Sequence, residues 1–200
     1  MELFAARALF MDATYDMRGS RHAASATTMD TIITLRPDSR IIQGGSAAAH
    51  DLTRLRENNV DLLINCTTNI PNPLWYGEWN TPAVTNFPVC DAMVERRMDE
   101  GGSILSLLEP LFNEVRSCFA MGKNVMIHCR AGIHRAGTMG VILAMEFLNL
   151  NARDALRHVR KHRRNTCVMG RTSVGALSVC ATGTLGRRRL ANGRLQVLAF

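Results

Sequence analysis

The chain has 200 residues, 46% of them hydrophobic, and it carries a formal net charge of +7. This length and hydrophobicity predict one domain with a sizeable core, and no apolar run reaches the roughly 18 residues that a membrane-spanning helix needs. The positive charge favours acidic partners, such as phosphorylated protein, anionic lipid or RNA; the alternative is a basic enzyme whose charge serves only its solubility.

The six cysteines, at positions 66, 90, 118, 129, 167 and 180, lack the close spacing of a zinc site or of a small secreted disulfide framework. They favour reduced thiols, and we therefore expect a cytoplasmic protein. Residues 1–26 contain three arginines among alanines and serines, which suits an organellar transit peptide. Three acidic residues in the same stretch argue against import, because transit peptides are poor in acids.

The first 28 residues are weakly patterned and predict an N-terminal extension. Two short apolar segments, 32–35 and 41–42, lie on either side of Pro37-Asp38 and predict a pair of strands. A helix is expected from Ser46 to Leu55 and beyond, ending at Asn58-Asn59.

Residues 60–64 predict a buried strand that closes at Asn65-Cys66, and residues 83–89 predict another that leads to Cys90-Asp91. The segment between them, 70–81, is irregular and carries Trp75, Tyr76 and Trp79. These aromatic side chains either line the rim of a pocket or cap the core.

Residues 103–119 place apolar side chains on one helical stripe, and Pro110 within it implies a fresh helix start or a kink. Asn151 is expected to cap a later helix whose apolar face is Ala152, Ala155, Leu156 and Val159. The basic run at residues 160–164 ends that helix. It either complements the helix dipole as solvated surface or binds anions.

Strands that alternate with helices predict an α/β fold with a central, mostly parallel sheet flanked by helices. The domain is expected at residues 29–165, between the extension at 1–28 and a C-terminal extension at 166–200 that is rich in Gly, Ser, Thr and Arg.

The segment 124–137 predicts a strand, a loop and a core helix, since a short apolar run stops at His128-Cys129 and a longer one resumes after Arg135. Such a loop lies at the amino end of a helix, where unpaired N–H groups and the helix dipole favour an anion such as phosphate. The helix N–H groups and a guanidinium both favour the thiolate form of a cysteine there. Arg135 also offers a planar fork that matches two phosphoryl oxygens.

The pattern His128-Cys129-x5-Arg135, with Gly132 in the middle, resembles the signature of the cysteine-dependent protein tyrosine phosphatases, and of their dual-specificity branch in particular. The resemblance runs from about residue 32 to residue 164. It implies a phosphatase that acts on phosphotyrosine, phosphoserine or phosphothreonine in protein and needs no metal or cofactor. Cys129 would be the nucleophile and Arg135 the clamp on the transition state. The implied substrate-binding residues are Arg130, Ala131, Gly132, Ile133 and His134.

The same resemblance implies a general acid. Asp91 stands three residues after Pro88, as in the acid loop of that family, and Glu95, Asp99 and Glu100 are alternatives on the same segment. His128 is expected to fix the loop by hydrogen bonds and not to transfer protons.

Two further positions follow from the resemblance. Ala136 stands where the family usually has Ser or Thr. The phosphatases of regenerating liver also carry alanine there and are slow, so we expect slow turnover. Cys66 resembles the cysteine that forms a reversible disulfide with the nucleophile in some relatives; the alternative is a small buried hydrophobic residue.

Three functions remain open. The first is a phosphatase that acts on phosphoprotein, and the second is a phosphatase that acts on a phosphoinositide or an RNA 5′ triphosphate. The third is a weakly active, phosphatase-like module that binds RNA or protein.

Overall fold

A computed structural model describes residues 27–88 and 104–167 of the chain. The strands are β1 (Met29–Arg36), β2 (Ser39–Gly45), β3 (Val60–Asn65), β4 (Ala83–Asn86) and β5 (Asn124–Cys129). The helices are α3 (Ser46–Ala49), α4 (Leu52–Glu57), α6 (Ile104–Ala120), α7 (Arg135–Leu148) and α8 (Ala152–His162).

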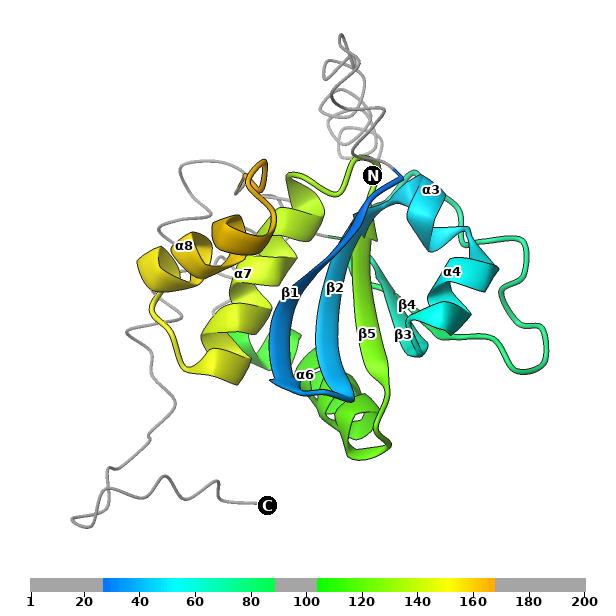
Figure 1. The fold of residues 1–200 in the computed structure, drawn as a ribbon, viewed down its shortest axis with the longest axis horizontal. Helices are drawn as coiled ribbons and strands as arrows, with labels where there is room; N and C mark the ends of the chain where they lie inside the picture. The colour runs from blue at the N-terminus through cyan, green and yellow to red at the C-terminus, as the bar shows by residue number, and fades with distance from the viewer. Residues whose placement is uncertain (1–26, 89–103, 168–200) are drawn as a thin grey trace, which may run out of the picture.

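The strands form one sheet in the order β1-β2-β5-β3-β4, with helices on both faces (Figure 1). Strands β2, β5, β3 and β4 run parallel, and β1 pairs with β2 in the antiparallel direction. The predicted α/β fold with a central, mostly parallel sheet flanked by helices is therefore confirmed.

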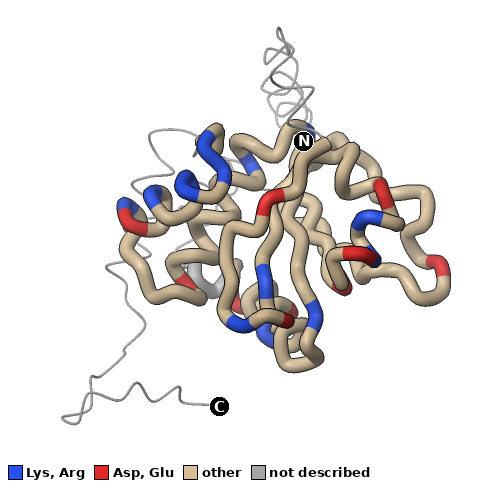
Figure 2. The backbone as a smooth tube through the Cα atoms, in the orientation of Figure 1, with Lys and Arg blue, Asp and Glu red and all other residues tan. Residues whose placement is uncertain are grey.

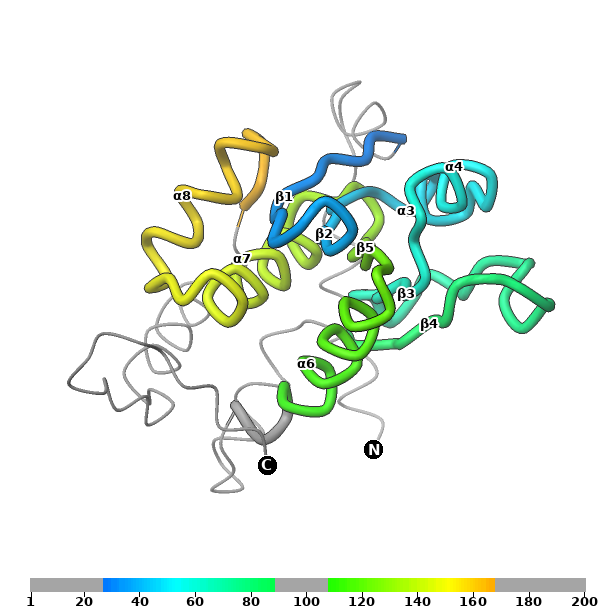
Figure 3. The backbone as a smooth tube through the Cα atoms, turned by 60° about the horizontal axis from the view of Figure 1, so that its bottom comes forward, coloured from blue at the N-terminus to red at the C-terminus, as the bar shows by residue number. Residues whose placement is uncertain are grey.

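Alternate residues of the central strand pack on opposite faces of the sheet, as the period of two in a strand requires. Val125 and Ile127 belong to a core that α6, α7 and α8 cover, whereas Met126 belongs to a second core that α3 and α4 cover. Figure 3 shows the two helical layers on either side of the sheet. Both faces are thus buried, which explains why this strand is continuously apolar from Val125 to Ile127.

The strand pair around Pro37-Asp38 is confirmed as the hairpin of β1 and β2. The single helix expected from Ser46 is wrong, because α3 ends at Ala49 and α4 begins at Leu52. Asp51 separates the two helices: its side chain accepts a hydrogen bond from the Arg54 N–H at 3.1 Å and so caps the start of α4.

The aromatic residues of the β3–β4 connection divide between the core and the surface. Trp75 is buried in the second core, and its Nε1 donates to the His50 carbonyl at 3.2 Å. Trp79 and Leu74 are almost fully exposed, and Tyr76 is half exposed. Capping of the core is therefore confirmed for Trp75.

Strand β4 is shorter than predicted, since it ends at Asn86. Phe87 still donates its N–H to the Asn65 carbonyl at 2.9 Å, but Pro88 has no N–H with which to continue the ladder. Helix α6 runs through Pro110, so the fresh helix start expected there is wrong. Asn151 caps α8 as predicted, because its side chain accepts from the Asp154 N–H at 3.0 Å.

The parallel strands bring their carboxyl ends to one edge of the sheet. Gly45 of β2 pairs with Cys129 of β5, and Asn65 of β3 pairs with both His128 of β5 and Asn86 of β4. Ligand sites of open α/β sheets lie at this edge. The predicted extensions at 1–28 and 166–200 fall outside the described residues except for Thr27, Thr28, Thr166 and Cys167.

Candidate functional site

Cys129 is the last residue of β5 and lies at the centre of the carboxyl edge, with only 4% of its surface exposed. Five residues, 130–134, connect it to Arg135, the first residue of α7; we call them the anion loop. The structure thus has the predicted order of strand, loop and buried helix. Cysteine and arginine stand at the two ends of the anion loop.

Gly132 allows the anion loop to turn against β2. Its φ of +66° lies in the left-handed region that side chains disfavour. A Cβ atom at this position would also lie 2.4 Å from the Gly44 carbonyl oxygen. Only glycine satisfies both conditions, which is why the middle of the loop has no side chain.

All five carbonyls of the anion loop accept hydrogen bonds from groups outside it. The donors come from α3, β2, the start of α7 and the segment after α8, so the loop is held from behind along its whole length. The bonds are Ser46 N to Arg130 at 3.0 Å, Arg163 Nη2 to Ala131 at 3.2 Å, Gln43 Nε2 to Gly132 at 2.8 Å, Cys167 N to Ile133 at 3.1 Å and Thr138 N to His134 at 2.7 Å.

The direction of these carbonyls fixes the direction of the amides. In a trans peptide the N–H of the next residue points opposite to the C=O, and the described residues contain no cis peptide bond. The N–H groups of residues 131–135 therefore turn away from the donors and toward the inside of the loop. This is the arrangement that binds an oxyanion.

The basic run at 160–164 is not all solvated surface, because Arg163 is buried. Its side chain is only 3% exposed, and its Nε donates to the Gly132 carbonyl at 2.9 Å. The other guanidinium nitrogens contact the Ala131 carbonyl, Thr28 Oγ1 and the Asp30 carboxylate. Asp30 thus supplies the counter-charge that a buried guanidinium needs.

The buried position of Arg163 does not follow from the basic run as a whole, because the other basic residues of the run are exposed. A signal was available in the helical period, since residue 163 follows the buried Ala155 and Val159 at intervals of eight and four residues. By contrast, Arg160, Lys161 and Arg164 are exposed. Figure 2 shows how densely basic positions follow one another along α8 and the residues after it.

His128 is fully buried before Cys129, and neither ring nitrogen makes a hydrogen bond to another described residue. Burial, with a smaller contribution from the charge of His50, lowers the pKa of His128 to about 4. A contact with the backbone of Cys129, which opposes this lowering of the pKa, is the one support for the expectation that the side chain fixes the loop by hydrogen bonds. The backbone serves that purpose, because the His128 carbonyl accepts from the Cys66 N–H at 2.9 Å.

Cys66 lies beside the end of β5, directly after β3. It is fully buried in the same core as Cys129. Burial, and then the neighbouring Cys129, raise the pKa of the Cys66 thiol well above its usual value, while the charge of Arg135 opposes the shift. These effects place the two thiols and the Arg135 guanidinium in one electrostatic environment.

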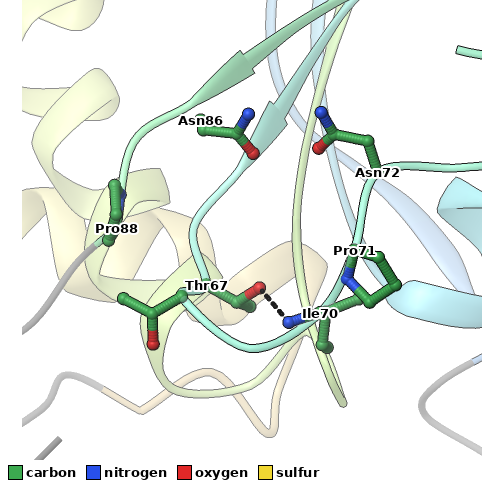
Figure 4. Close-up of a pocket in the computed structure, with 7 residues that line it drawn as sticks. Thr67, Ile70, Pro71, Asn72, Asn86 and Pro88 are labelled. Atoms are coloured by element: carbon green, nitrogen blue, oxygen red, sulfur yellow. Dashed lines mark hydrogen bonds between the residues drawn. The ribbon is translucent and has the colours of Figure 1, made fainter. Parts of the chain in front are cut away.

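A pocket of about 410 Å³ opens at the carboxyl ends of β3 and β4 (Figure 4). Buried Asn65 holds two of the lining residues in place: its Oδ1 accepts from the Thr67 hydroxyl at 2.7 Å and its Nδ2 donates to the Ile70 carbonyl at 3.0 Å. The lining residues are Thr67, Thr68, Ile70, Pro71, Asn72, Asn86 and Pro88. They are all uncharged, and no sequence pattern indicated that they form a pocket.

The remaining predicted site residues divide between described and undescribed positions. Arg130 is exposed at the mouth of the anion loop, and His134 is half-buried next to Arg135. Asp91 and its alternatives Glu95, Asp99 and Glu100 lie outside the described residues.

Within residues 27–88 and 104–167, no group of three or more His, Cys, Asp or Glu side chains could hold a metal ion. None of the helices in these ranges is long and apolar enough to cross a membrane.

Comparisons with known proteins agree with this geometry. The family model for the catalytic domain of dual specificity phosphatases matches residues 41–175. The tyrosine-protein phosphatase vhp-1 of Caenorhabditis elegans is 28% identical over 145 residues, which are 72% of this chain and 20% of that protein. The chain therefore spans about a fifth of the length of that relative.

Solved structures share the fold. The crystal structure of human DUSP28 superposes with a TM-score of 0.60 at 18% identity and covers 78% of this chain and 93% of that one. The crystal structure of PTPMT1 in complex with PI(5)P has a TM-score of 0.59 at 16% identity and covers 78% and 95%.

Replacement of Arg163 by lysine tests its hold on the loop. We expect Arg163→Lys to lower the free energy of unfolding by about 2 kcal/mol, because one ammonium cannot bond both loop carbonyls and Thr28. The affinity of the protein for tungstate, measured by calorimetry, should fall as well. Arg164→Lys is the matched control at the exposed neighbouring position. Equal stability and equal tungstate affinity in the two variants would contradict this role.

Acid should destabilise the protein through His128. The folded-state pKa of about 4 lies below the ordinary value of 6.5. As the pH falls from 6.5 to 4, the unfolded chain takes up a proton that the folded chain does not. Stability present above pH 6.5 is thus lost across this window, by up to roughly 3 kcal/mol. Urea unfolding at pH 7.5, 6, 5 and 4 should show a smaller loss in His128→Gln, and parallel pH profiles would contradict the assignment.

Proposed function

The chain belongs to the dual specificity phosphatase family, and on that premise we propose that it hydrolyses phosphotyrosine, phosphoserine or phosphothreonine in protein through a phosphocysteine intermediate. The anion loop carries this proposal, because its five carbonyls are held from behind and its amides turn inward beside Cys129. Preorganised N–H groups of this kind stabilise the charge that develops on phosphoryl oxygens during transfer.

In the proposed reaction, the Cys129 thiolate attacks phosphorus and forms the S–P bond while the P–O bond to the leaving group breaks. Asp91 gives its proton to the departing oxygen. Arg135 and the amides of residues 130–135 bind the three equatorial oxygens. Water then attacks the phosphocysteine, the Asp91 carboxylate takes a proton from that water, and phosphate and the Cys129 thiolate are released.

The position of Arg135 supports its part in this scheme. It is the first residue of α7, so its guanidinium and the positive end of the helix act at the same place. Its charge reaches Cys66 and His128, which flank Cys129. A cation so placed can bind an anion that the thiolate attacks.

The role of Asp91 rests on the sequence and on the path of the chain before it. Strand β4 ends at the same edge as β5, and the hydrogen bond from Phe87 to Asn65 continues the chain in that direction. The chain therefore leaves β4 at the same edge of the sheet as the anion loop, with β3 between them.

A second enzymatic candidate is a phosphatase for phosphoinositides or RNA 5′ triphosphates. The net charge of +7 and the exposed cations of α8 support it, because these substrates are strongly anionic. A phosphatase-like binding module for RNA or protein is the third. Assays of the purified protein against phosphopeptides, phosphoinositides and triphosphorylated RNA separate the two enzymatic functions. Salt-sensitive RNA binding that survives loss of Cys129 would favour the binding module.

Hydrolysis of an aryl phosphate without added metal tests the proposed chemistry. We expect Cys129→Ser and Arg135→Ala each to abolish it, because one removes the nucleophile and the other the transition-state clamp. Asp91→Asn should slow substrates with poor leaving groups most, since these need the proton. Full activity of Cys129→Ser would overturn the assignment, and an equal loss across leaving groups would point to another acid.

We further propose that Ala136 makes turnover slow. It is fully buried at the start of α7, where a hydroxyl in other family members would stabilise the leaving thiolate in the second step. Hydrolysis of the phosphocysteine should therefore limit the rate. Rapid-quench experiments should show a burst of the released alcohol, and Ala136→Ser should raise the steady rate. Absence of a burst together with an unchanged rate would mean that the first step is limiting.

Cys66 is proposed as a redox partner of Cys129. Neighbouring strands lie about 4.8 Å apart, and the hydrogen bond from Cys66 to His128 continues that spacing to the strand ends. This fits the Cα separation of a disulfide. Peroxide would convert Cys129 to the sulfenic acid, and Cys66 would then attack its sulfur, losing a proton and releasing water as the disulfide forms.

Mild peroxide should accordingly inactivate the protein reversibly, and Cys66→Ser should make the inactivation irreversible. Peptide mapping after oxidation should find the Cys66–Cys129 bond. Cys118 is the internal control, because its Sγ contacts the Asn124 carbonyl at the opposite end of β5. A bond from Cys129 to Cys90 or Cys118, or an unpaired Cys129 that thiol restores, would reject the proposal.

A further inference from the structure

The surfaces on the two sides of the anion loop differ in charge. Strand β5, which leads into the loop, lies in the middle of the sheet, with β2 and β1 on one side and β3 and β4 on the other. Helix α8 packs against β1 and exposes a row of cations. The uncharged pocket lies at the ends of β3 and β4 (Figure 4).

The cations of α8 form one stripe. Residues 153, 157 and 160 are spaced by four and three positions, which places them on one face of α8. Lys161 is beside them, and Arg164 follows two residues after the helix ends. All five side chains are exposed. The stripe ends close to the outer, carbonyl side of the anion loop, because the adjacent Arg163 donates to the Gly132 carbonyl.

Only part of this charge is used within the protein. Arg157 pairs with Asp154 at 2.8 Å, and Arg160 donates to the Thr166 carbonyl at 2.9 Å. Arg153, Lys161 and Arg164 make no ion pair with any residue of the described ranges. Their charges add to the positive potential around the anion loop, which attracts an anionic ligand.

The pocket on the other side offers hydrogen bonds without charge. The side chains of Asn72 and Asn86 face each other across it, and Thr67 lies at its base (Figure 4). Amide and hydroxyl groups of this kind accept a neutral side chain or a peptide backbone, and they give no compensation to a buried carboxylate.

We propose that the substrate is a phosphorylated peptide segment with acidic residues on only one side of the phosphorylated residue, lying along α8 while its uncharged side occupies the pocket. The inference rests on the proposed phosphatase function. The helical part of the stripe, from residue 153 to residue 161, is about 12 Å long, which matches roughly three to four residues of extended peptide.

The surface of α8 favours a peptide over a membrane or RNA. The large exposed hydrophobic side chains among the described residues are Leu35, Leu74, Tyr76, Trp79 and Met121, and none of them is on α8. A helix that lies in a membrane interface needs an apolar face beside its cations. Single-stranded RNA is bound largely by stacking on aromatic rings, and this surface presents no Phe, Tyr or Trp.

Two phosphotyrosine peptides of identical composition test the inference, one with four acidic residues before the phosphotyrosine and one with the same four after it. Fluorescence anisotropy measures their binding to Cys129→Ser protein, and phosphate release measures hydrolysis by the unaltered chain. We expect one peptide to bind roughly tenfold more tightly, as several exposed ion pairs allow, and the difference should shrink in high salt.

The variant Lys161→Gln with Arg164→Gln should remove most of that difference. The matched control, Arg56→Gln with Lys123→Gln, removes the same charge from α4 and from the opposite end of β5 and should retain the difference. Equal binding of the two peptides, or equal effects of the two double variants, would overturn the inference. Tighter binding of phosphatidylserine vesicles or single-stranded RNA, lost with Lys161 and Arg164, would also overturn it.

The outcomes separate this inference from the proposed function. If the unaltered chain hydrolyses neither the peptides nor an aryl phosphate while the unequal binding persists, the phosphatase proposal fails and the peptide-docking surface stands. If hydrolysis proceeds at equal rates with both peptides and their binding is equal, the function stands and the docking surface fails.

Discussion

The candidate site depends on hydrogen bonds to the carbonyls of the anion loop, and these come from parts of the chain that are far apart in sequence. Gln43, Ser46, Arg163 and Cys167 each donate to one or two of them. Buried peptide groups without partners cost free energy, so the loop holds its conformation only when every donor is in place. Strand β2, helix α3 and the segment after α8 must therefore all be in place for the anion loop to hold its conformation.

Two glycines let these elements approach one another. A Cβ atom at Gly132 would strike the Gly44 carbonyl, and one at Gly44 would lie 2.5 Å from the Met126 side chain and 2.9 Å from the Thr28 carbonyl. The anion loop, β2 and the chain at Thr28 are thus packed backbone against backbone at one point, and the Met126 side chain of β5 fills the space beside them. The same closeness brings Thr28 and Asp30 within reach of Arg163, so the start of β1 supports the loop through a buried cation.

Local patterns predicted the fold well because each rests on interactions within a few residues. The apolar run at 125–127, the cap at Asn151 and the Cys129-x5-Arg135 spacing are of this kind. The break between α3 and α4 was missed because a cap by Asp51 competes with helix continuation, and composition does not decide between them. The role of Arg163 was missed because its partners lie 31 to 135 positions away in the sequence.

The two titratable side chains that flank Cys129 on the strand side of the site, His128 and Cys66, are uncharged near neutral pH. His128 is neutral near pH 7 because burial lowers its pKa to about 4, and Cys66 is a neutral thiol because burial raises its pKa. The positive charge therefore comes from the helix side, where Arg135 begins α7. An oxyanion is drawn toward the amides and Arg135, which leaves its central atom facing the Cys129 sulfur at the end of β5. In the proposed reaction, the charge of Arg135 and the amides of the anion loop would therefore orient the phosphoryl group toward the Cys129 sulfur.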